Sequence, residues 1–198
     1  MNIATRPIPF SHDRPDGVTR RKWTGDEVLA MAKAGIIGPG ERYQLIGGDL
    51  VTMASKGARH EIVRCKLLFH WVRSAPDGIM VTSESPLKLN PNDEPEPDLM
   101  LFPATIPVPD VRGDTALLVV EVADWSLSYD LKVKSLLYAA HGVREYWMID
   151  ADKTLVTHVH RRPSADGYAS VVEVPPSALL TPQLVPALAV RLADLSLA

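Results

Sequence analysis

The feature that most constrains the fold is a short apolar run that contains one acidic residue. Residues 117–122 read Leu-Leu-Val-Val-Glu-Val, so a strand formed there is apolar on both faces except at Glu121. Such a strand is expected at the centre of a sheet that is covered on both sides. Burying a carboxylate there is costly unless a cation or several hydrogen-bond donors meet it. Glu121 therefore predicts either a structural ion pair with a lysine or arginine, or a site that holds a cation.

The chain as a whole predicts one α/β domain. Its 198 residues can enclose a sizeable core, and neither a repeat nor a linker divides them. Residues 1–20 are polar and rich in proline without an apolar period, so we expect a flexible N-terminal arm. Residues 21–198 are then expected to form a single domain.

Local signals place the secondary-structure elements. Thr24 and Glu27 form a capping box, and Gly47-Gly48 is a two-residue turn signal. The expected elements are helices from Thr24 to about Gly35, at 60–74 and at 131–140, a hairpin at 42–53, and strands at 80–89, 98–102, 117–123, 145–150 and 155–161. This order indicates a mixed sheet flanked by helices. The aromatic side chains expected in the core or at an interface are Trp125, Tyr146 and Trp147.

Composition excludes several classes of protein. No apolar run reaches the roughly twenty residues that a membrane span needs, and the N-terminus lacks a signal-peptide pattern. The single cysteine, Cys65, cannot form an internal disulfide, which favours a cytoplasmic location, and its apolar helical context predicts a buried thiol. The net charge of −3 argues against a broad basic surface for gripping phosphates. It remains compatible with a nuclease, because carboxylates at a metal site lower the overall charge.

Asp98 supplies a possible partner for Glu121. It follows Pro97 at the start of the strand at 98–102, although it can also be read as the aspartate that ends the preceding turn. Carboxylates at the ends of two neighbouring strands can converge on one hard cation, which prefers oxygen ligands. The backbone carbonyl of Val122 can add a further ligand. These residues predict a divalent metal held by Asp98, Glu121 and Val122.

Lys134 is the third candidate. In a helix at 131–140 it shares one face with Leu131, Leu137 and Tyr138, whereas Lys132 projects about 160° away. That face is expected to pack on the sheet, so the ammonium group can reach the two carboxylates. The alternative is a lysine that extends along the apolar face toward solvent.

Several motifs occur in an order typical of one family. They are Glu41-Arg-Tyr-Gln-Leu-Ile-Gly-Gly-Asp-Leu50, Glu96-Pro-Asp-Leu99, Val119-Val-Glu-Val-Ala-Asp-Trp-Ser-Leu-Ser-Tyr-Asp130, Lys134 followed by Tyr138, and Gly142-Val-Arg-Glu-Tyr-Trp147. In this combination the chain resembles the Uma family of restriction-endonuclease-like proteins, within the PD-(D/E)XK nuclease superfamily. The resemblance extends over roughly residues 21–195 and implies a restriction-endonuclease-like core.

The resemblance also implies an activity. It implies an endonuclease that hydrolyses phosphodiester bonds in DNA, with Asp98 and Glu121 binding Mg²⁺ or Mn²⁺ and Lys134 assisting the attacking water. The usual lysine position is Ala123 in this chain, and the lysine of the Uma family stands on the following helix. By analogy with nucleases that cut duplexes, we expect a homodimer that binds DNA transiently.

One departure from the family bears on activity. The family commonly has glutamate where this chain has Gln44, and an acidic residue at Gly47. A glutamine can coordinate a metal or a metal-bound water but carries no charge. The second hypothesis is therefore a catalytically degenerate nuclease fold that serves as a nucleic-acid-binding or assembly module. Asp49 can compensate as an accessory residue, although a role in the hairpin turn is preferred.

The other polar candidates are accessory. His60 opens a helix where the family often has a histidine, and it either reaches the site or caps the helix. Tyr138 follows Lys134 on the same helical face. His158 and His160 share one face of a strand, but zinc would need further ligands. Asp130 is expected to be the N-cap of its helix.

Overall fold

The computed structural model describes residues 21–53, 55–124 and 129–196, so the expected N-terminal arm at 1–20 and Trp125 lie outside the described residues. The elements in chain order are α1 (Gly25–Lys33), β1 (Tyr43–Ile46), β2 (Asp49–Thr52), α2 (Ala58–Ser74), β3 (Ile79–Ser83), β4 (Leu99–Pro103), η1 (Val108–Asp110), β5 (Leu118–Ala123), η2 (Asp130–Lys134), α4 (Ser135–Ala140), β6 (Glu145–Asp150), β7 (Thr157–Ser164), β8 (Gly167–Val174), η3 (Pro186–Leu188) and η4 (Leu192–Leu195). No helix in these ranges is long and apolar enough to span a membrane.

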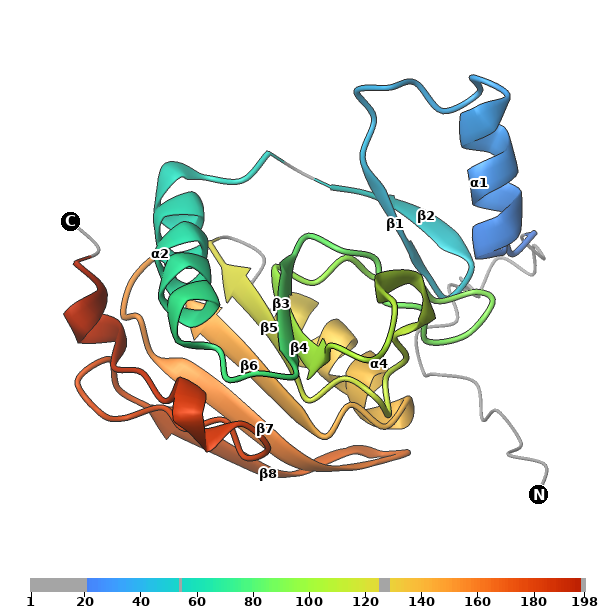
Figure 1. Ribbon diagram of the computed structural model, residues 1–198. Helices are drawn as coiled ribbons and strands as arrows, with labels where there is room; N and C mark the ends of the chain where they lie inside the picture. The colour runs from blue at the N-terminus through green and yellow to red at the C-terminus, as the bar shows by residue number, and fades with distance from the viewer. Residues whose placement is uncertain (1–20, 54, 125–128, 197–198) are drawn as a thin grey trace.

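A mixed six-stranded sheet forms the centre of the molecule, which confirms the predicted α/β class. Its strands lie in the order β3-β4-β5-β6-β7-β8. β5 and β6 are parallel, and every other neighbouring pair is antiparallel. The connection between the parallel strands contains η2 and α4. Figure 1 shows α2 on one face of the sheet and α4 on the other, with α1 and the β1–β2 hairpin beside the sheet.

The central strand β5 is buried along its whole length, as its apolar run predicts. Its side chains alternate between two apolar clusters. One cluster contains Val120 and packs against Leu67 of α2, and the other contains Val119 and packs against Tyr138 of α4. The odd-numbered position Glu121 therefore faces the α4 side of the sheet.

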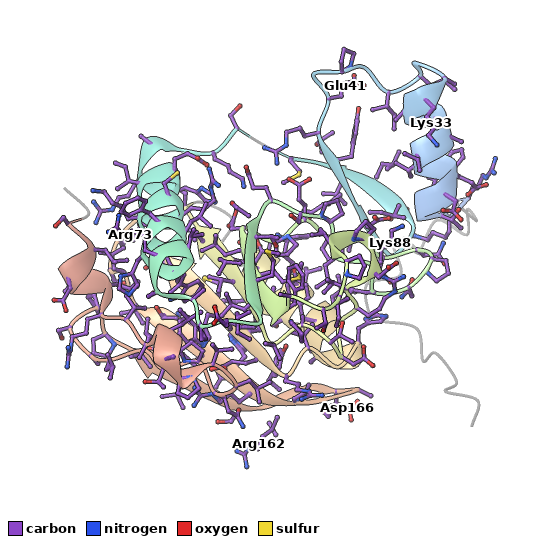
Figure 2. All side chains as sticks on the ribbon, viewed as in Figure 1. Lys33, Glu41, Arg73, Lys88, Arg162 and Asp166 are labelled. Carbon is purple, nitrogen blue, oxygen red and sulfur yellow. The ribbon has the colours of Figure 1, made fainter. Side chains whose placement is uncertain are left out.

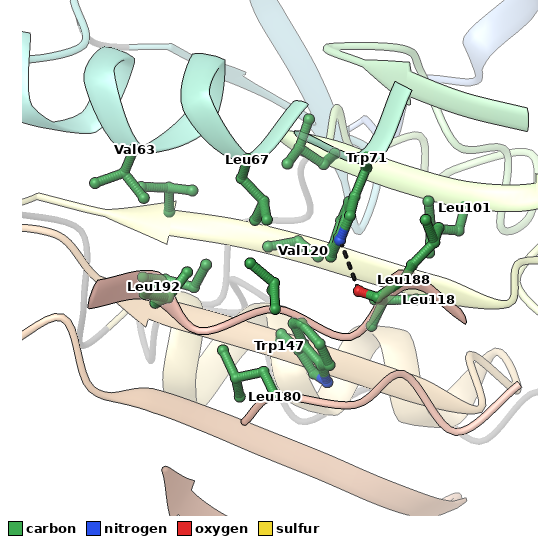
Figure 3. Close-up of a cluster of buried hydrophobic side chains, with 14 of the residues drawn as sticks. Val63, Leu67, Trp71, Leu101, Leu118, Val120, Trp147, Leu180, Leu188 and Leu192 are labelled. Atoms are coloured by element: carbon green, nitrogen blue, oxygen red, sulfur yellow. Dashed lines mark hydrogen bonds between the residues drawn. The ribbon is translucent and has the colours of Figure 1, made fainter. Parts of the chain in front are cut away.

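Trp71 joins α2 to the sheet and to the C-terminal segment. Its ring lies 5.9 Å from that of Trp147 on β6, and its Nε1–H donates to the Leu188 carbonyl at 2.9 Å. Figure 3 shows this hydrogen bond inside the cluster of Val63, Leu67 and Val120. The cluster thus packs η3 against the same face of the sheet as α2.

The local signals at the N-terminal side of the chain are confirmed. The Thr24 side chain accepts from the Glu27 N–H, and Glu27 accepts from the Thr24 N–H, so both halves of the capping box are present. Gly47 and Gly48 take left-handed φ values of +57° and +77° between β1 and β2. Residues without a side chain adopt this conformation at low cost, which explains the tight two-residue turn.

The structure differs from the prediction at two strands, one that ends early and one that was not predicted. The strand expected at 80–89 ends at Ser83, because Glu84 has a left-handed φ of +52° and the chain leaves the sheet there. The edge strand β8 was not predicted. Its neighbouring valines Val171 and Val172 are both exposed, so its burial does not alternate cleanly and the sequence pattern is weak.

Three local predictions were wrong in detail. The helix expected at 131–140 begins as a π-helical turn, η2, before α4. Tyr129 stands at the N-cap position in place of Asp130, whose side chain points inward. Cys65 is exposed on α2, because the buried face of that helix is formed by other positions such as Val63 and Leu67.

We predict that Trp71→Ala lowers the free energy of unfolding by about 3–5 kcal/mol, because it leaves a cavity and an unpaired Leu188 carbonyl. Urea denaturation followed by fluorescence of the remaining tryptophans measures this loss. Phe69→Ala is the matched control, because Phe69 lies on the same helix with 63% of its surface exposed. Its effect is expected to stay within about 0.5 kcal/mol. Equal effects of the two substitutions would contradict the assignment of Trp71 to the core.

Candidate active site

A group of buried charged side chains distinguishes one end of the sheet. Charged residues such as Lys33, Arg73 and Asp166 project from the surface in Figure 2. Asp98, Glu121, Asp130 and Lys134 are instead buried, each with 6% or less of its surface exposed. Buried charges need partners, so their contacts define what this end of the sheet can do.

The sheet brings Asp98 and Glu121 together. Leu99 pairs with Val120 and Met100 with Val119, so one further step of this register sets Asp98 opposite Glu121. Because side chains alternate along strands, both carboxylates project toward the α4 side. The predicted convergence of the two acids thus follows from the pairing of β4 with β5.

Asp98 is held by fixed donors on one of its oxygens. Its Oδ2 accepts the Val122 N–H at 2.7 Å and lies 3.0 Å from His60 Nε2. His60 lies in the first turn of α2, and its contact with Asp98 shows that its side chain reaches the site. The other oxygen, Oδ1, lies 2.6 Å from Lys56 Nζ.

Glu121 is paired from the helix that follows it. Lys134 Nζ lies 2.9 Å from Glu121 Oε1, and the Tyr138 hydroxyl donates to the same oxygen at 2.7 Å. Lys134 also lies 3.3 Å from Asp130 Oδ1. Lys132 is exposed, as the helical-face argument predicts. The π-helical turn directs both Asp130 and Lys134 inward, and such turns are frequent at functional sites.

The two carboxylates ionise differently. Burial opposes ionisation of Asp98, but the hydrogen bond from His60 and the charge of Lys56 outweigh it and hold the pKa of Asp98 well below its usual value. Burial raises the pKa of Glu121 to about 8, against the opposing charge of Lys134 and with the support of the Asp98 and Asp130 charges. Lys134 loses hydration by burial, yet Glu121 and Asp130 raise its pKa, so it stays protonated.

A cavity of ≈ 210 Å³ opens onto these groups. Its lining includes Asp98, Glu121, Val122 and Lys134, together with Gln44 of β1. Gln44 Oε1 is buried and meets no hydrogen-bond donor in the described parts of the chain. A buried amide oxygen without a donor is costly, so this atom is available to a ligand in the cavity.

The remaining predicted residues take other roles. Asp49 begins β2 beside the hairpin turn and pairs with Lys22 at 3.0 Å, which supports the turn reading. His160 is buried between the rings of Tyr146 and Tyr168 at 5.1 and 5.5 Å, and His158 Nδ1 lies 3.6 Å from Glu173 on the neighbouring strand. Neither histidine lines the cavity.

Sequence reasoning missed Lys56 and Glu84. Lys56 Nζ lies 2.6 Å from both Asp98 Oδ1 and Glu84 Oε1. Lys56 stands in the irregular segment before α2, where neither helical nor strand periodicity predicts the direction of a side chain. The contact with Asp98 spans 42 positions of the chain, so nothing local signals it.

Comparison with known proteins decides the family. The profile of the Uma2 family, described as "Putative restriction endonuclease", matches residues 26–196. The chain belongs to this family. A crystal structure described as "a putative nuclease belonging to DUF820" from Anabaena variabilis ATCC 29413 superposes with a TM-score of 0.65 at 16% identity, covering 77% of this chain and 88% of that one. No curated protein matches.

These findings confirm the predicted resemblance and the restriction-endonuclease-like fold. They also support a nuclease-like function, for which nucleic acid is the substrate class.

We predict that the stability of the metal-free protein falls as pH rises from about 5 to about 8. The folded state keeps a proton on Glu121 up to a pKa of about 8, whereas a glutamate in the unfolded chain loses it near the ordinary pKa of 4.5. Folding therefore takes up a proton in this window, which favours the folded state at its acidic end. Urea midpoints measured with a chelator at pH 5 and pH 8 test this, and Glu121→Gln is expected to remove that part of the difference. An identical pH dependence in the variant would contradict the assignment.

Proposed function

We propose that this protein is a metal-dependent endonuclease that hydrolyses phosphodiester bonds in DNA. The observation that carries the proposal is the convergence of Asp98, Glu121 and Lys134 beside one cavity in a chain of a nuclease family. The proposed catalytic residues are these three. DNA is favoured over RNA by the family description alone, so cleavage of both is to be compared.

The proposed metal ligands are oxygen atoms. In the described ranges, no three side chains of His, Cys, Asp or Glu are grouped so that they could hold a metal by themselves. Asp98 and Glu121 would therefore share a metal with amide oxygen, backbone oxygen and water. Gln44 Oε1 fits this need, because Gln44 lines the cavity and this oxygen meets no hydrogen-bond donor among the described residues. Such a donor set suits a hard cation, Mg²⁺ or Mn²⁺.

The backbone of β5 supports Val122 as a further ligand. The N–H and C=O of one strand residue project toward the same side. The Ala123 carbonyl accepts from Ala151 on the β6 side at 2.8 Å, and the Val122 N–H donates to Asp98 on the β4 side. The Val122 carbonyl is therefore directed to the side of β5 on which Asp98 lies.

The residues divide the chemistry among them. A divalent ion held by these residues would supply positive charge that polarises the scissile phosphate and lowers the pKa of a water molecule. Lys134, protonated and buried, would orient the attacking water and stabilise negative charge that develops on the phosphate. Tyr138 fixes the Glu121 carboxylate through its hydroxyl, and His60 fixes Asp98. A cytoplasmic homodimer belongs to the proposal by analogy, and the molar mass in solution tests the dimer.

We predict that Glu121→Gln and Lys134→Met each reduce the rate of DNA cleavage by about 10²-fold or more, because each removes charge at the reacting centre. Nicking of supercoiled plasmid with Mn²⁺ or Mg²⁺ measures the rate. Lys132→Met is the matched control, since it removes an exposed lysine two residues away on the opposite face of the helix.

The control is expected to cleave at the wild-type rate, and circular dichroism checks that all variants are folded. A wild-type protein that cleaves neither DNA nor RNA with either metal would count against the proposed activity. Cleavage that persists in both variants would show that the catalytic centre lies elsewhere in the protein.

A catalytically degenerate binding or assembly module is the second candidate, and Gln44 is the observation that favours it. We predict that Gln44→Glu tightens Mn²⁺ binding about tenfold, because a third carboxylate then faces the cavity. Isothermal titration calorimetry measures the affinity, and Gln183→Glu adds the same charge at an exposed position as a control. Cleavage that appears only in Gln44→Glu would favour the degenerate module, whereas tight Mn²⁺ binding by the wild type would exclude it.

A further inference from the structure

Lys56 places a positive charge on one of the proposed metal ligands. Its Nζ lies 2.6 Å from Asp98 Oδ1, and its side chain lines the cavity with 15% of its surface exposed. The mechanism proposed above gives this lysine no role. A metal that takes Asp98 Oδ1 would meet the ammonium group on the same oxygen.

The two oxygens of Asp98 are held in different ways. Oδ2 accepts a backbone N–H from the buried strand β5 and contacts His60 at the start of α2, so regular elements fix both partners. Oδ1 is contacted by a long, flexible side chain that comes from an irregular segment. Oδ1 is thus the oxygen that can change its partner without a change in the fold.

Lys56 differs from Lys134 in its freedom to move. The Lys134 side chain is 7% exposed, lies on a helix and is held between Glu121 and Asp130. Lys56 has its second partner, Glu84, on the outer side of the site, where 27% of the Glu84 side chain is exposed. An ammonium that leaves Asp98 therefore keeps an ion pair with Glu84 and stays hydrated.

Neighbouring cations keep Glu84 ionised, so that it can accept the Lys56 ammonium group. Arg42 lies 3.3 Å and Arg64 3.7 Å from its carboxylate oxygens. Burial raises its pKa, but Lys56 and the two arginines outweigh that effect and lower it, so Glu84 stays ionised. The carboxylate thus remains a fixed negative charge beside Lys56.

We infer that Lys56 is an internal counterion that competes with the divalent metal for Asp98 and moves to Glu84 when the metal binds. An ammonium and a divalent cation on one carboxylate oxygen would lie within about 4 Å of each other, where like charges repel strongly at low dielectric. The inference rests on the proposed metal site and deepens it. Without metal, Lys56 then neutralises the charge of Asp98. Metal binding must displace this ammonium group, so it requires a higher metal concentration than the same ligands would need in the absence of Lys56.

The first test is Mn²⁺ titration by calorimetry in the absence of nucleic acid. Lys56→Met is expected to bind Mn²⁺ about tenfold more tightly than the wild type, because the competitor is gone. Lys66→Met is the matched control, since it removes an exposed lysine of α2 and is expected to bind as the wild type does. Equal affinity of Lys56→Met and wild type overturns the inference and leaves the metal site standing. Absence of binding in all three proteins overturns both.

The second test needs no substitution and so does not depend on a variant that folds. Wild-type protein is acetylated briefly with acetic anhydride, with and without Mn²⁺, and each lysine is quantified by peptide mass spectrometry. Labelling of Lys56 is expected to rise several-fold with Mn²⁺, while Lys66 and Lys132 stay constant. Constant or reduced labelling of Lys56 at a Mn²⁺ concentration that calorimetry shows to be saturating overturns the inference.

Discussion

The buried contact between the Glu121 carboxyl group and the Lys134 ammonium is the interaction on which the rest of the structure depends. A carboxyl group inside the central strand would destabilise the fold unless hydrogen-bond donors reached it. The ammonium donor comes from the helix that connects β5 to β6, at a separation of 2.9 Å. This pairing requires the helix to cover the α4 face of the sheet with Lys134 inward, and its π-helical first turn brings Asp130 to the same ammonium. The contacts that hold this helix on the sheet are therefore the same contacts that form the candidate site.

Asp98 and Lys56 form a second contact between a carboxylate and a lysine, in which the lysine is freer to move. Asp98 and Glu121 each contact one lysine, so each carboxyl group has a cationic partner inside the protein itself. Lys134 is confined by a helix and two acids, whereas Lys56 has a partly exposed alternative in Glu84. These internal contacts agree with the modest net charge of −3, because acidic residues that contact lysines inside the protein do not need a broad basic surface to offset their charge. This arrangement also allows the two lysines to have different proposed roles: Lys134 assists the hydrolysis, and Lys56 competes with the metal for Asp98.

Much of the fold was predictable because its signals are local. The capping box of Thr24, the Gly47-Gly48 turn and the doubly buried strand β5 each follow from a few adjacent residues. The edge strand β8 was missed because strand pairing, rather than alternating burial, holds it in the sheet. The left-handed Glu84 ended β3 early, and sequence pattern gives no warning of such a residue.

By itself, the sequence determined that Glu121 is buried, that Asp98 lies at the beginning of a neighbouring strand, directly before its first residue, and that Lys134, not Lys132, faces the sheet. Periodicity carries that information, because it fixes which side of a strand or helix a residue occupies. The tertiary structure alone decided which side chains meet across the chain: His60 and Lys56 on Asp98, Gln44 at the same cavity, and Glu84 beside Lys56. These residues come from a helix start, a hairpin strand and irregular segments. Their approach is set by how α2 and the hairpin pack at the end of the sheet, and no local pattern encodes that packing.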